Sequence, residues 1–280
     1  MAKTVLITGA STGIGRATAL YFQQQGWNVV ATMRTPAKET ELGQLPGVAL
    51  IALDVTKPDS IRQGLQAAIA KFGKLDAVVN NAGYALNGPF EAYTQEQIRR
   101  QFETNVFGLM EVCRQVLPHF RQNKAGVLVN VASMGGRLTF PLYSSYHSTK
   151  WAVEGFSESL HYELRPLGIA VKIVEPGAIK TDFMDRSADV VTADGLPDYK
   201  ALVDVTTANY TAAGSSGAAP TLVAESIFKA AADGSRRLRY TVGTDARGLL
   251  TCDALLQAAG EVELIARRAA DGRVAFAVRD

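Results

Sequence analysis

The chain has 280 residues, of which 47% are hydrophobic and 20% charged, which suits one large α/β domain with a sizeable core. Its 29 basic and 27 acidic residues give a formal net charge of +2, a balance that argues against a general nucleic-acid binder. Two distant cysteines, a short N-terminal apolar run and the lack of a long uncharged apolar stretch predict a cytoplasmic protein without a disulfide framework, metal site or membrane span.

Short apolar runs rich in β-branched residues alternate with longer helical patterns as far as Pro176. The apolar runs predict strands at residues 5–7, 29–31, 48–51, 77–79, 127–129 and 170–174. The periodic stretches predict helices at about residues 14–25, 60–72, 95–120 and 144–164. Continuous apolar strands separated by helices are typical of parallel strands buried on both faces. We therefore expect a Rossmann-type, doubly wound parallel sheet of the α/β class with right-handed crossovers.

The periodicity weakens after Pro176. Residues 182–219 are rich in Ala, Thr, Ser, Gly and Asp, and a stretch this long without periodicity is usually a functional lid or a disordered loop. Beyond it we expect a helix at about 221–232, a strand at 238–242, a helical stretch from Leu249, and a short run at 273–278 that the pattern does not place. We interpret residues 1–280 as a single domain with a core (3–182), a mobile substrate lid (183–219) and a C-terminal extension (220–280).

A glycine-rich turn, Thr8-Gly9-Ala10-Ser11-Thr12-Gly13-Ile14-Gly15, stands between the first strand and the first helix. Glycines let the backbone turn tightly and approach a pyrophosphate, and the unpaired N–H groups that open a helix favour an anion. The spacing is G-x-x-x-G-x-G rather than the common G-x-G-x-x-G, so a plain structural turn is the alternative. The residues expected to touch a dinucleotide are Gly9, Ser11, Thr12, Gly13, Ile14 and Gly15.

Three further motifs follow in chain order: Asp54-Val55, Asn80-Asn81-Ala82-Gly83, and Pro176-Gly177 with Ile179 and Thr181. Together with the glycine turn they resemble the short-chain dehydrogenase/reductase (SDR) family over residues 3–182. The resemblance implies that the acid hydrogen-bonds near the adenine, that the Asn-Asn-Ala-Gly motif steadies the central sheet and lies along the cofactor, and that the Pro-Gly segment holds the nicotinamide carboxamide. Each motif alone is compatible with a turn or a cap, but their occurrence in this order argues against coincidence.

Four residues match the catalytic tetrad that this resemblance implies. Tyr146 and Lys150 lie four apart in a predicted helix and project from one face, a pair that is by itself common on helix surfaces. Ser133 stands thirteen residues before Tyr146, just after a predicted strand, and Asn105 lies in the preceding long helix. The family's Asn uses its helix backbone and a water to pass protons to the lysine, so we expect the same of Asn105.

The residue types fit hydride transfer to a carbonyl, which leaves negative charge on oxygen and needs a waiting proton donor. A free tyrosine titrates near pH ~10, and lowering its pKa by about three units requires roughly 4 kcal/mol of preference for phenolate. One unit charge about 4 Å away supplies about that much at an effective dielectric near 20, so the Lys150 ammonium is the expected source. Ser133 is expected to hydrogen-bond the substrate oxygen and to hold it against Tyr146.

Other polar residues near the tetrad have simpler interpretations. We expect Tyr143 to line a pocket and His147 to point elsewhere on the helix. Ser144, Ser145 and Ser148 are interpreted as caps or packing residues, and Glu154 as a solvated helix acid. The basic cluster of Arg236, Arg237 and Arg239 is interpreted as a solvated helix end.

The choice between nicotinamide cofactors is read at the end of the second strand, where NAD users usually carry an acid that binds both ribose hydroxyls. Counting from the glycine turn, that position is Met33, and Arg34 follows it. The planar guanidinium of Arg34 suits a 2′-phosphate, with a solvated arginine as the alternative. Thr12 in the glycine turn offers at most a hydrogen bond. NADP(H) is therefore favoured over NAD(H).

These features predict an NADP(H)-dependent oxidoreductase acting on a ketone, aldehyde or secondary alcohol, in a homodimer or homotetramer. The alternatives are an NAD-dependent alcohol dehydrogenase and a non-catalytic NADP(H)-binding regulator, although a regulator has little reason to keep all four tetrad residues. Two apolar segments are expected to wall the site and to favour an apolar substrate. One is Met134 to Tyr143, and the other is the lid, with Phe183, Met184, Val190, Val191, Leu196, Tyr199 and Leu202.

Overall fold

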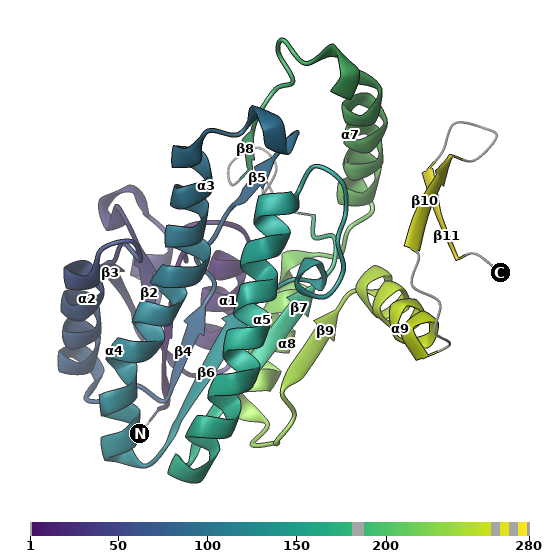
Figure 1. The fold of residues 1–280 in the computed structure, drawn as a ribbon. Helices are drawn as coiled ribbons and strands as arrows, with labels where there is room; N and C mark the ends of the chain where they lie inside the picture. The colour runs from purple at the N-terminus through teal and green to yellow at the C-terminus, as the bar shows by residue number, and fades with distance from the viewer. Residues whose placement is uncertain (1, 181–187, 259–263, 269–273, 279–280) are drawn as a thin grey trace.

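The computed structural model describes residues 2–180, 188–258, 264–268 and 274–278, with side chains as far as Thr251. Its centre is a parallel sheet of seven strands in the order β3-β2-β1-β4-β6-β7-β9 (Figure 1). The strands are β1 (Thr4–Ile7), β2 (Asn28–Met33), β3 (Val48–Ala52), β4 (Ala77–Asn80), β6 (Gly126–Val131), β7 (Ile169–Pro176) and β9 (Arg239–Val242). The predicted doubly wound sheet is confirmed. The strand order reverses between β1 and β4, and ligands of such sheets bind beyond the carboxyl ends of the strands at this point.

Helices cover both faces of the sheet (Figure 1). One face packs on α1 and α8 through Phe22 and Ile227, and the other packs on α2, α4 and α5 through Leu65, Val112 and Val153. Both clusters are built from fully apolar side chains because each strand is buried on both sides. The helices are α1 (Gly13–Gln24), α2 (Pro58–Phe72), α3 (Gln95–Phe102), α4 (Gly108–Asn123), α5 (Ser144–Leu164) and α8 (Pro220–Ala232). Short 3-10 helices lie at Pro36–Lys38, Leu42–Gln44, Phe90–Ala92, Met134–Gly136 and Arg165–Leu167.

The long helix expected at residues 95–120 is interrupted. Between α3 and α4 the chain forms a π-helical turn, Glu103–Phe107, whose central residue is Asn105. Single π-turns inside α-helices are rare and occur frequently at functional sites. The apolar periodicity continues through the insertion, so the sequence pattern gave no sign of it.

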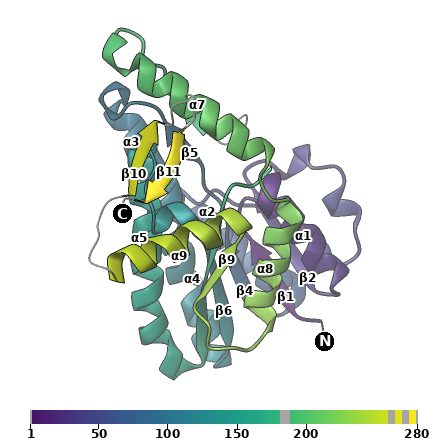
Figure 2. The same cartoon turned by 90° about the vertical axis from the view of Figure 1, so that its right-hand side faces the viewer.

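The predicted lid contains regular structure that the sequence analysis did not expect. Its first described strand, β8 (Ala188–Val190), pairs in parallel with β5 (Ala85–Asn87). After a 3-10 turn at Pro197–Tyr199, α7 (Lys200–Ser215) stands above the carboxyl edge of the sheet (Figure 2). Thr206 is the one buried residue of α7, so this helix has no apolar stripe from which a pattern would reveal it.

The C-terminal extension opens with α8 and β9 and continues with α9 (Thr244–Ala258), which starts five residues before Leu249. Residues Leu264–Arg268 (β10) pair in an antiparallel way with Val274–Val278 (β11). The described part of the run that the sequence pattern did not place, residues 274–278, is therefore a strand. Figure 1 shows this two-stranded sheet apart from the central one. Within the described residues, no helix is both long enough and apolar enough to cross a membrane.

Candidate active site

The glycine turn crosses the carboxyl end of β1 and packs tightly against the segment after β4. Gly9 and Gly13 have φ values of +68° and +54°, a region that favours glycine. A Cβ atom on Gly9 would lie 2.9 Å from Cα of Ala82. A Cβ on Gly15 would overlap the carbonyl oxygen of Gly9. The glycines therefore let the turn pack closely on itself and on the segment after β4, while Ser11 and Gly13 remain exposed.

Thr8 and Asn81 hold this turn in place. The Thr8 hydroxyl accepts hydrogen bonds from the backbone N–H groups of Asn81 and Ala82, both at 3.0 Å. The Asn81 side-chain amide donates to the carbonyl oxygens of Thr8 and Gly9, at 3.0 and 3.1 Å. Asn81 thus shapes the expected cofactor site through its side chain. The sequence analysis placed Thr8 in the motif but gave it no role.

Asn80 ties the centre of the sheet to α5, as the resemblance implied for its motif. Its amide donates to Oδ1 of Asn130 at 2.9 Å, and the Asn130 amide donates to the Ser157 hydroxyl at 2.8 Å. All three side chains are buried. Buried amides of this kind must be paired, so the chain of hydrogen bonds fixes β4, β6 and α5 relative to one another.

Asp54 and Val55 lie directly after β3, between that strand and α2. Oδ1 of Asp54 accepts hydrogen bonds from the backbone N–H and the hydroxyl of Thr56, at 3.0 and 2.7 Å. Val55 packs closely on α4, because a Cβ on Gly108 would lie 2.8 Å from the Val55 carbonyl oxygen. One carboxylate oxygen of the predicted adenine-binding acid is therefore engaged in a local turn.

Three tetrad residues meet at the carboxyl ends of β6 and β7. Tyr146 and Lys150 lie one turn apart on α5, with Nζ of Lys150 at 5.7 Å from the centroid of the Tyr146 ring. Nζ also donates to the Val131 carbonyl oxygen at 3.0 Å. Ser133 forms a side-chain hydrogen bond with Tyr146 and accepts one from the Gly135 N–H at 3.1 Å. The serine, the phenol and the ammonium therefore share one site.

Asn105 reaches this site indirectly. Its Oδ1 accepts from the Tyr84 N–H at 3.0 Å, and its amide donates to the Tyr84 carbonyl oxygen at 2.8 Å and to the Thr149 hydroxyl at 3.1 Å. Thr149 in turn donates to the Tyr146 carbonyl oxygen at 2.7 Å. The Asn105 side chain thus joins the π-turn to α5 and to the segment after β4. Because the side chain is engaged in these bonds, the proton-transfer role expected of Asn105 rests on its backbone.

Comparison with known proteins identifies the family of this chain. Residues 3–190 match the family model described as short chain dehydrogenase. The chain belongs to this family. An uncharacterized oxidoreductase of Schizosaccharomyces pombe is 38% identical to the dehydrogenase over 223 residues, or 75% of this chain and 88% of the relative. The 3-ketodihydrosphingosine reductase of Bacteroides thetaiotaomicron is 39% identical over 184 residues, or 66% of each chain.

Solved structures agree with the family and with a nicotinamide cofactor. A short-chain dehydrogenase from Streptomyces avermitilis is 34% identical to this dehydrogenase with a TM-score of 0.81, over 92% of this chain and 94% of that one. ElxO with NADP bound has a TM-score of 0.74 at 26% identity, over 89% and 100% of the two chains. A Burkholderia phymatum short-chain dehydrogenase/reductase in complex with NAD has a TM-score of 0.78 at 25% identity, over 93% and 95%. The predictions of an SDR enzyme and of oxidoreductase activity are confirmed.

Burial has opposite effects on the two titratable tetrad residues of the dehydrogenase. It raises the pKa of the Tyr146 phenol to about 12, against a smaller lowering by the hydrogen bond with Ser133. It lowers the pKa of the Lys150 ammonium to about 8, against a smaller raising by Glu154. Both shifts come from burial disfavouring the charged form. The pKa of Tyr146 therefore lies above its ordinary value, because burial outweighs the lowering that the sequence analysis expected from Lys150. Tyr146 holds its proton at neutral pH, which is the state that a proton donor requires.

His147 has a structural role that the sequence analysis missed. Its Nδ1 donates to the Gly135 carbonyl oxygen at 2.8 Å, and its Nε2 accepts from the Phe140 N–H at 3.0 Å. The bond that Nε2 accepts needs the neutral ring, and burial lowers the pKa of His147 accordingly. The imidazole thus ties the turn that carries Ser133 to the loop before Tyr146. Nothing in the sequence beyond its position next to Tyr146 pointed to this role.

The predicted lid is joined to the catalytic helix by aromatic rings. The rings of Tyr146 and Tyr143 lie 5.7 Å apart, and those of Tyr143 and Tyr210 of α7 lie 5.0 Å apart. The Tyr210 hydroxyl donates to the Pro141 carbonyl oxygen at 2.6 Å. Val190 and Leu202 are exposed rather than lining a site, and Phe183 and Met184 lie outside the described residues.

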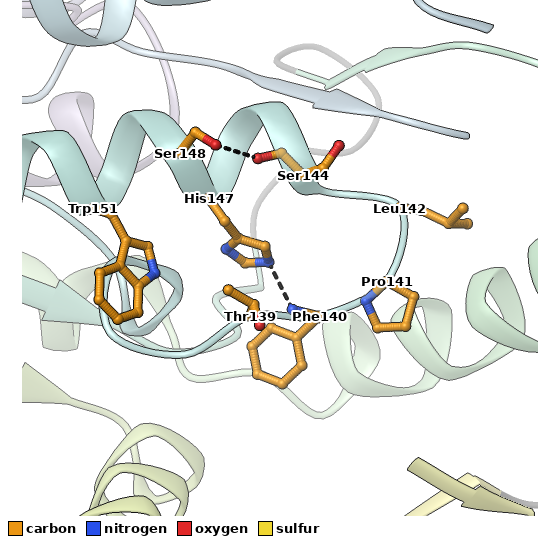
Figure 3. A pocket seen from close by; sticks show the side chains of 8 residues that line it. All are labelled: Thr139, Phe140, Pro141, Leu142, Ser144, His147, Ser148 and Trp151. Atoms are coloured by element: carbon orange, nitrogen blue, oxygen red, sulfur yellow. Dashed lines mark hydrogen bonds between the residues drawn. The ribbon is translucent and has the colours of Figure 1, made fainter. Parts of the chain in front are cut away.

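The loop before α5 also lines a surface pocket of about 500 Å³ (Figure 3). Its apolar walls come from the loop and from Trp151, while Tyr146 and Lys150 are not among its lining residues. The pocket therefore lies on a different face of α5 from the phenol. It is lined by Thr139, Phe140, Pro141, Leu142, Ser144, His147, Ser148 and Trp151.

Leu142 has the left-handed backbone conformation, with φ of +63°. Its carbonyl oxygen accepts hydrogen bonds from the Gly88 N–H at 2.9 Å, the Tyr93 hydroxyl at 3.1 Å and the Asn87 amide at 3.3 Å. A non-glycine residue in this conformation is strained, and several contacts of this kind are needed to keep it there. They fix the entry into α5.

The Pro-Gly segment after β7 is held by a residue far along the chain. A Cβ on Gly177 would overlap the carboxylate of Asp245, which accepts a hydrogen bond from the Ala178 N–H at 2.7 Å. Ile179 bridges to Ala218. Asp245 carried no motif signal, and Thr181 lies outside the described residues.

Glu39, the first acidic residue after β2 in the sequence, is engaged in local contacts. Arg34 is exposed directly after β2. Glu39 accepts hydrogen bonds from the backbone N–H groups of Glu41 and Leu42, both at 2.9 Å, and the bond from Leu42 is the main cause of its lowered pKa. Glu39 and Glu41 also pair with Arg16. These contacts keep the Glu39 carboxylate away from the role of binding ribose.

The sequence interpretations of Glu154 and Arg239 were wrong. Glu154 is buried, with 5% of its surface exposed, and Nε of Arg239 donates to its Oε2 at 3.0 Å. Arg239 also donates to Glu158 at 2.6 Å and lies 3.5 Å from the fully buried Glu175. Because β9 brings Arg239 alongside β7 and α5, residues distant in sequence pair here, and helix periodicity alone was not able to show it.

Proposed function

We propose that the dehydrogenase transfers a hydride between NADP(H) and an apolar ketone, aldehyde or secondary alcohol, with Tyr146 as general acid and base. The observation that carries the proposal is the hydrogen bond between Ser133 and Tyr146 beside the Lys150 ammonium. This arrangement offers a protonated phenol and a second hydroxyl to one substrate oxygen. A proton donor in this position contributes roughly 10²- to 10⁴-fold to a reaction rate.

The residues around the glycine turn fit a dinucleotide. Side chains at Gly9 and Gly15 would fill the turn, and its backbone opens α1, whose first N–H groups suit a pyrophosphate. The Pro176–Ile179 segment lies at the carboxyl end of β7, where the resemblance places the nicotinamide. When bound, the nicotinamide supplies or accepts the hydride.

The chain's own residues then handle the proton. In the direction of reduction, Ser133 and Tyr146 hydrogen-bond the carbonyl oxygen and orient its carbon. As negative charge develops on that oxygen, the Tyr146 hydroxyl gives up its proton to it. The Lys150 ammonium stabilises the phenolate that remains. Asn105 holds the π-turn against α5, and its backbone is the proposed route by which a water returns a proton to Lys150.

Arg34 is proposed to set the preference for NADP(H). The exposed guanidinium beyond β2 suits a 2′-phosphate, and Glu39 is occupied by backbone N–H groups. We expect Arg34→Ala to lower the ratio of NADPH to NADH use by roughly ten- to a hundredfold, since a hydrogen bond to a charged group is worth about 1.5–3 kcal/mol. The measurement is kcat/KM for both cofactors.

Arg62→Ala is the matched control for Arg34→Ala. Arg62 is an exposed arginine on α2 that pairs with Asp59 within its own helix. Its removal should leave the cofactor ratio unchanged. If Arg34→Ala keeps the wild-type ratio, Arg34 does not set the cofactor preference. If the wild type prefers NADH, the NAD-dependent alcohol dehydrogenase that the sequence left as an alternative is favoured.

An apolar substrate is proposed because the rings of Tyr143 and Tyr210 extend from Tyr146 toward the lid. A relative that is named a 3-ketodihydrosphingosine reductase points to a keto compound as well. The experiment follows NADPH consumption with straight-chain 2-ketones of rising length. Burial of apolar surface contributes roughly 25 cal/mol per Å², so kcat/KM should rise with chain length. A flat or falling series rules out the apolar site, and no turnover with any carbonyl favours the non-catalytic regulator.

A homodimer or homotetramer is also proposed. Phe107 beside α4 and Trp151 on α5 are about half exposed, and two such helices offer a surface that a second copy would cover. Sedimentation at micromolar concentration should give a species larger than 29.9 kDa, the mass of one chain. A species of that mass alone contradicts the proposal. Cytoplasmic location stays a prediction.

A further inference from the structure

A cluster of acidic and basic side chains, in which the two glutamates Glu154 and Glu175 are buried, links α5, β7 and β9. Glu175 on β7 is fully buried, and its Oε2 accepts a hydrogen bond from the Thr241 hydroxyl at 2.6 Å. Arg137 and Arg239 approach its Oε1, each at 3.5 Å. Arg239 also binds Glu154, whose other carboxylate oxygen, Oε1, is buried and has no hydrogen-bond partner among the described residues.

Glu154 lies one turn after Lys150 on α5, a spacing that places side chains on the same helix face. Gly136 packs into the space beside them, since a Cβ there would lie 2.9 Å from Cγ of Glu154 and 2.9 Å from the Lys150 carbonyl oxygen. Lys150 is buried as well, with 8% of its surface exposed. In such surroundings water screens little, so a neighbouring carboxylate acts strongly on an ammonium.

We propose that Glu154 is a positioning residue whose carboxylate, held by Arg239 and backed by Glu175, keeps the Lys150 ammonium charged beside Tyr146. The proposal rests on the proposed function, because it assigns Lys150 a charge that matters for proton transfer. Glu154 touches neither substrate nor cofactor and acts only through the lysine.

The charges around Glu154 determine over which pH range this effect operates. Glu158 on α5, Arg137 beside the Ser133 turn, Glu175 on β7 and Arg239 on β9 face it. Burial, and then the negative charge of Glu175, raise the pKa of Glu154 to about 7, while Arg239 lowers it. The carboxylate is therefore charged above about pH 7, where Lys150, with a pKa of about 8, begins to lose its proton.

The test compares Glu154→Gln with the wild type across pH. Removing the negative charge favours loss of the Lys150 proton, so the high-pH fall in kcat/KM for ketone reduction should move down by at least about half a pH unit. That shift corresponds to roughly a threefold lower kcat/KM on the high-pH side. Below about pH 7 the two profiles should coincide, because the wild-type carboxyl is then neutral as well.

Two control variants separate charge from structure. Glu154→Asp restores the carboxylate and should return the profile toward that of the wild type. Glu158→Gln removes a charge that also binds Arg239 but is 43% exposed, and it should leave the profile unchanged. If Glu154→Gln does not fold, Glu154→Met takes its place, because methionine has a similar length and also removes the negative charge. The same downward shift of the pH profile is expected for it.

A second readout does not need turnover. Trace acetylation with acetic anhydride, followed for Lys150 by mass spectrometry from about pH 6 to about pH 10, reports the fraction of free amine directly. The midpoint for Lys150 should fall in Glu154→Gln by the same half unit. If no ketone is reduced, the proposed function fails while this titration still tests Glu154. The proposal is overturned if the acetylation midpoint of Lys150 is unchanged in Glu154→Gln. It is also overturned if this midpoint moves while the pH profile of kcat/KM does not.

Discussion

Replacing Tyr146 with phenylalanine should abolish turnover while leaving NADPH binding nearly intact. The phenyl ring keeps the contact with the ring of Tyr143 and the packing beside Lys150. The hydroxyl is lost, and with it the hydrogen bond to Ser133 and the transferable proton. We expect kcat to fall by at least about 10²-fold, the contribution that a positioned acid typically makes. The measurements are kcat with the best ketone and the Kd of NADPH.

Tyr162→Phe is the matched control for this substitution. It makes the same chemical change on the same helix, but Tyr162 is 64% exposed near the end of α5. Its kcat should match that of the wild type. If Tyr146→Phe retains more than about a tenth of the wild-type kcat, another group donates the proton and Tyr146 is not the general acid.

Gly15→Ala should be the second most damaging substitution. The added Cβ would overlap the Gly9 carbonyl oxygen and lie 2.5 Å from the Asn81 amide nitrogen that holds the turn. A backbone carbonyl has no rotamer with which to move away, so the turn itself must shift. Loss of two hydrogen bonds to a charged pyrophosphate, at about 1.5–3 kcal/mol each, weakens NADPH binding by more than about a hundredfold. Fluorescence titration of NADPH measures the change.

Gly248→Ala provides the comparison for Gly15→Ala. Gly248 lies in α9, and a Cβ there would meet nothing within 4 Å. In an exposed helix position alanine is favoured over glycine by up to about 1 kcal/mol, so this variant should bind NADPH normally and melt no earlier. NADPH binding by Gly15→Ala within about threefold of the wild type would show that the cofactor does not use this turn.

The sequence predicted the sheet because the signal for it is local. Runs such as Val5-Leu6-Ile7 and Val127-Leu128-Val129 are apolar on both faces, which few arrangements other than a central parallel strand accommodate. The positions of Ser133, Tyr146 and Lys150 were predictable for a similar reason. Each follows a strand or occupies one helix face at a fixed spacing, and the structure brings them together.

Features that depend on contacts between distant segments were not predictable. Arg239 reaches Glu154 across 85 residues, and Asp245 reaches Ala178 across 67. The α7 helix has no apolar stripe because it is held by one buried threonine and by Tyr210, rather than by a packed face. His147 was expected only to point elsewhere on the helix than Tyr146, because its two hydrogen bonds go to backbone groups, whose positions no side-chain pattern shows.

The order of strands in the central sheet also has a consequence for how the chain reaches its native state. Every pairing is parallel, so each one requires a crossover, and even the neighbours β2 and β3 join Val29 to Val48. Pairings such as Val5 with Ala77 close far longer loops. The conformational entropy of such a loop is lost before the contacts that offset this loss can form. Chains dominated by such non-local contacts fold slowly and leave apolar strand edges unpaired for longer. Synthesis at reduced temperature, where aggregation competes less with folding, is therefore the sensible route to the active protein.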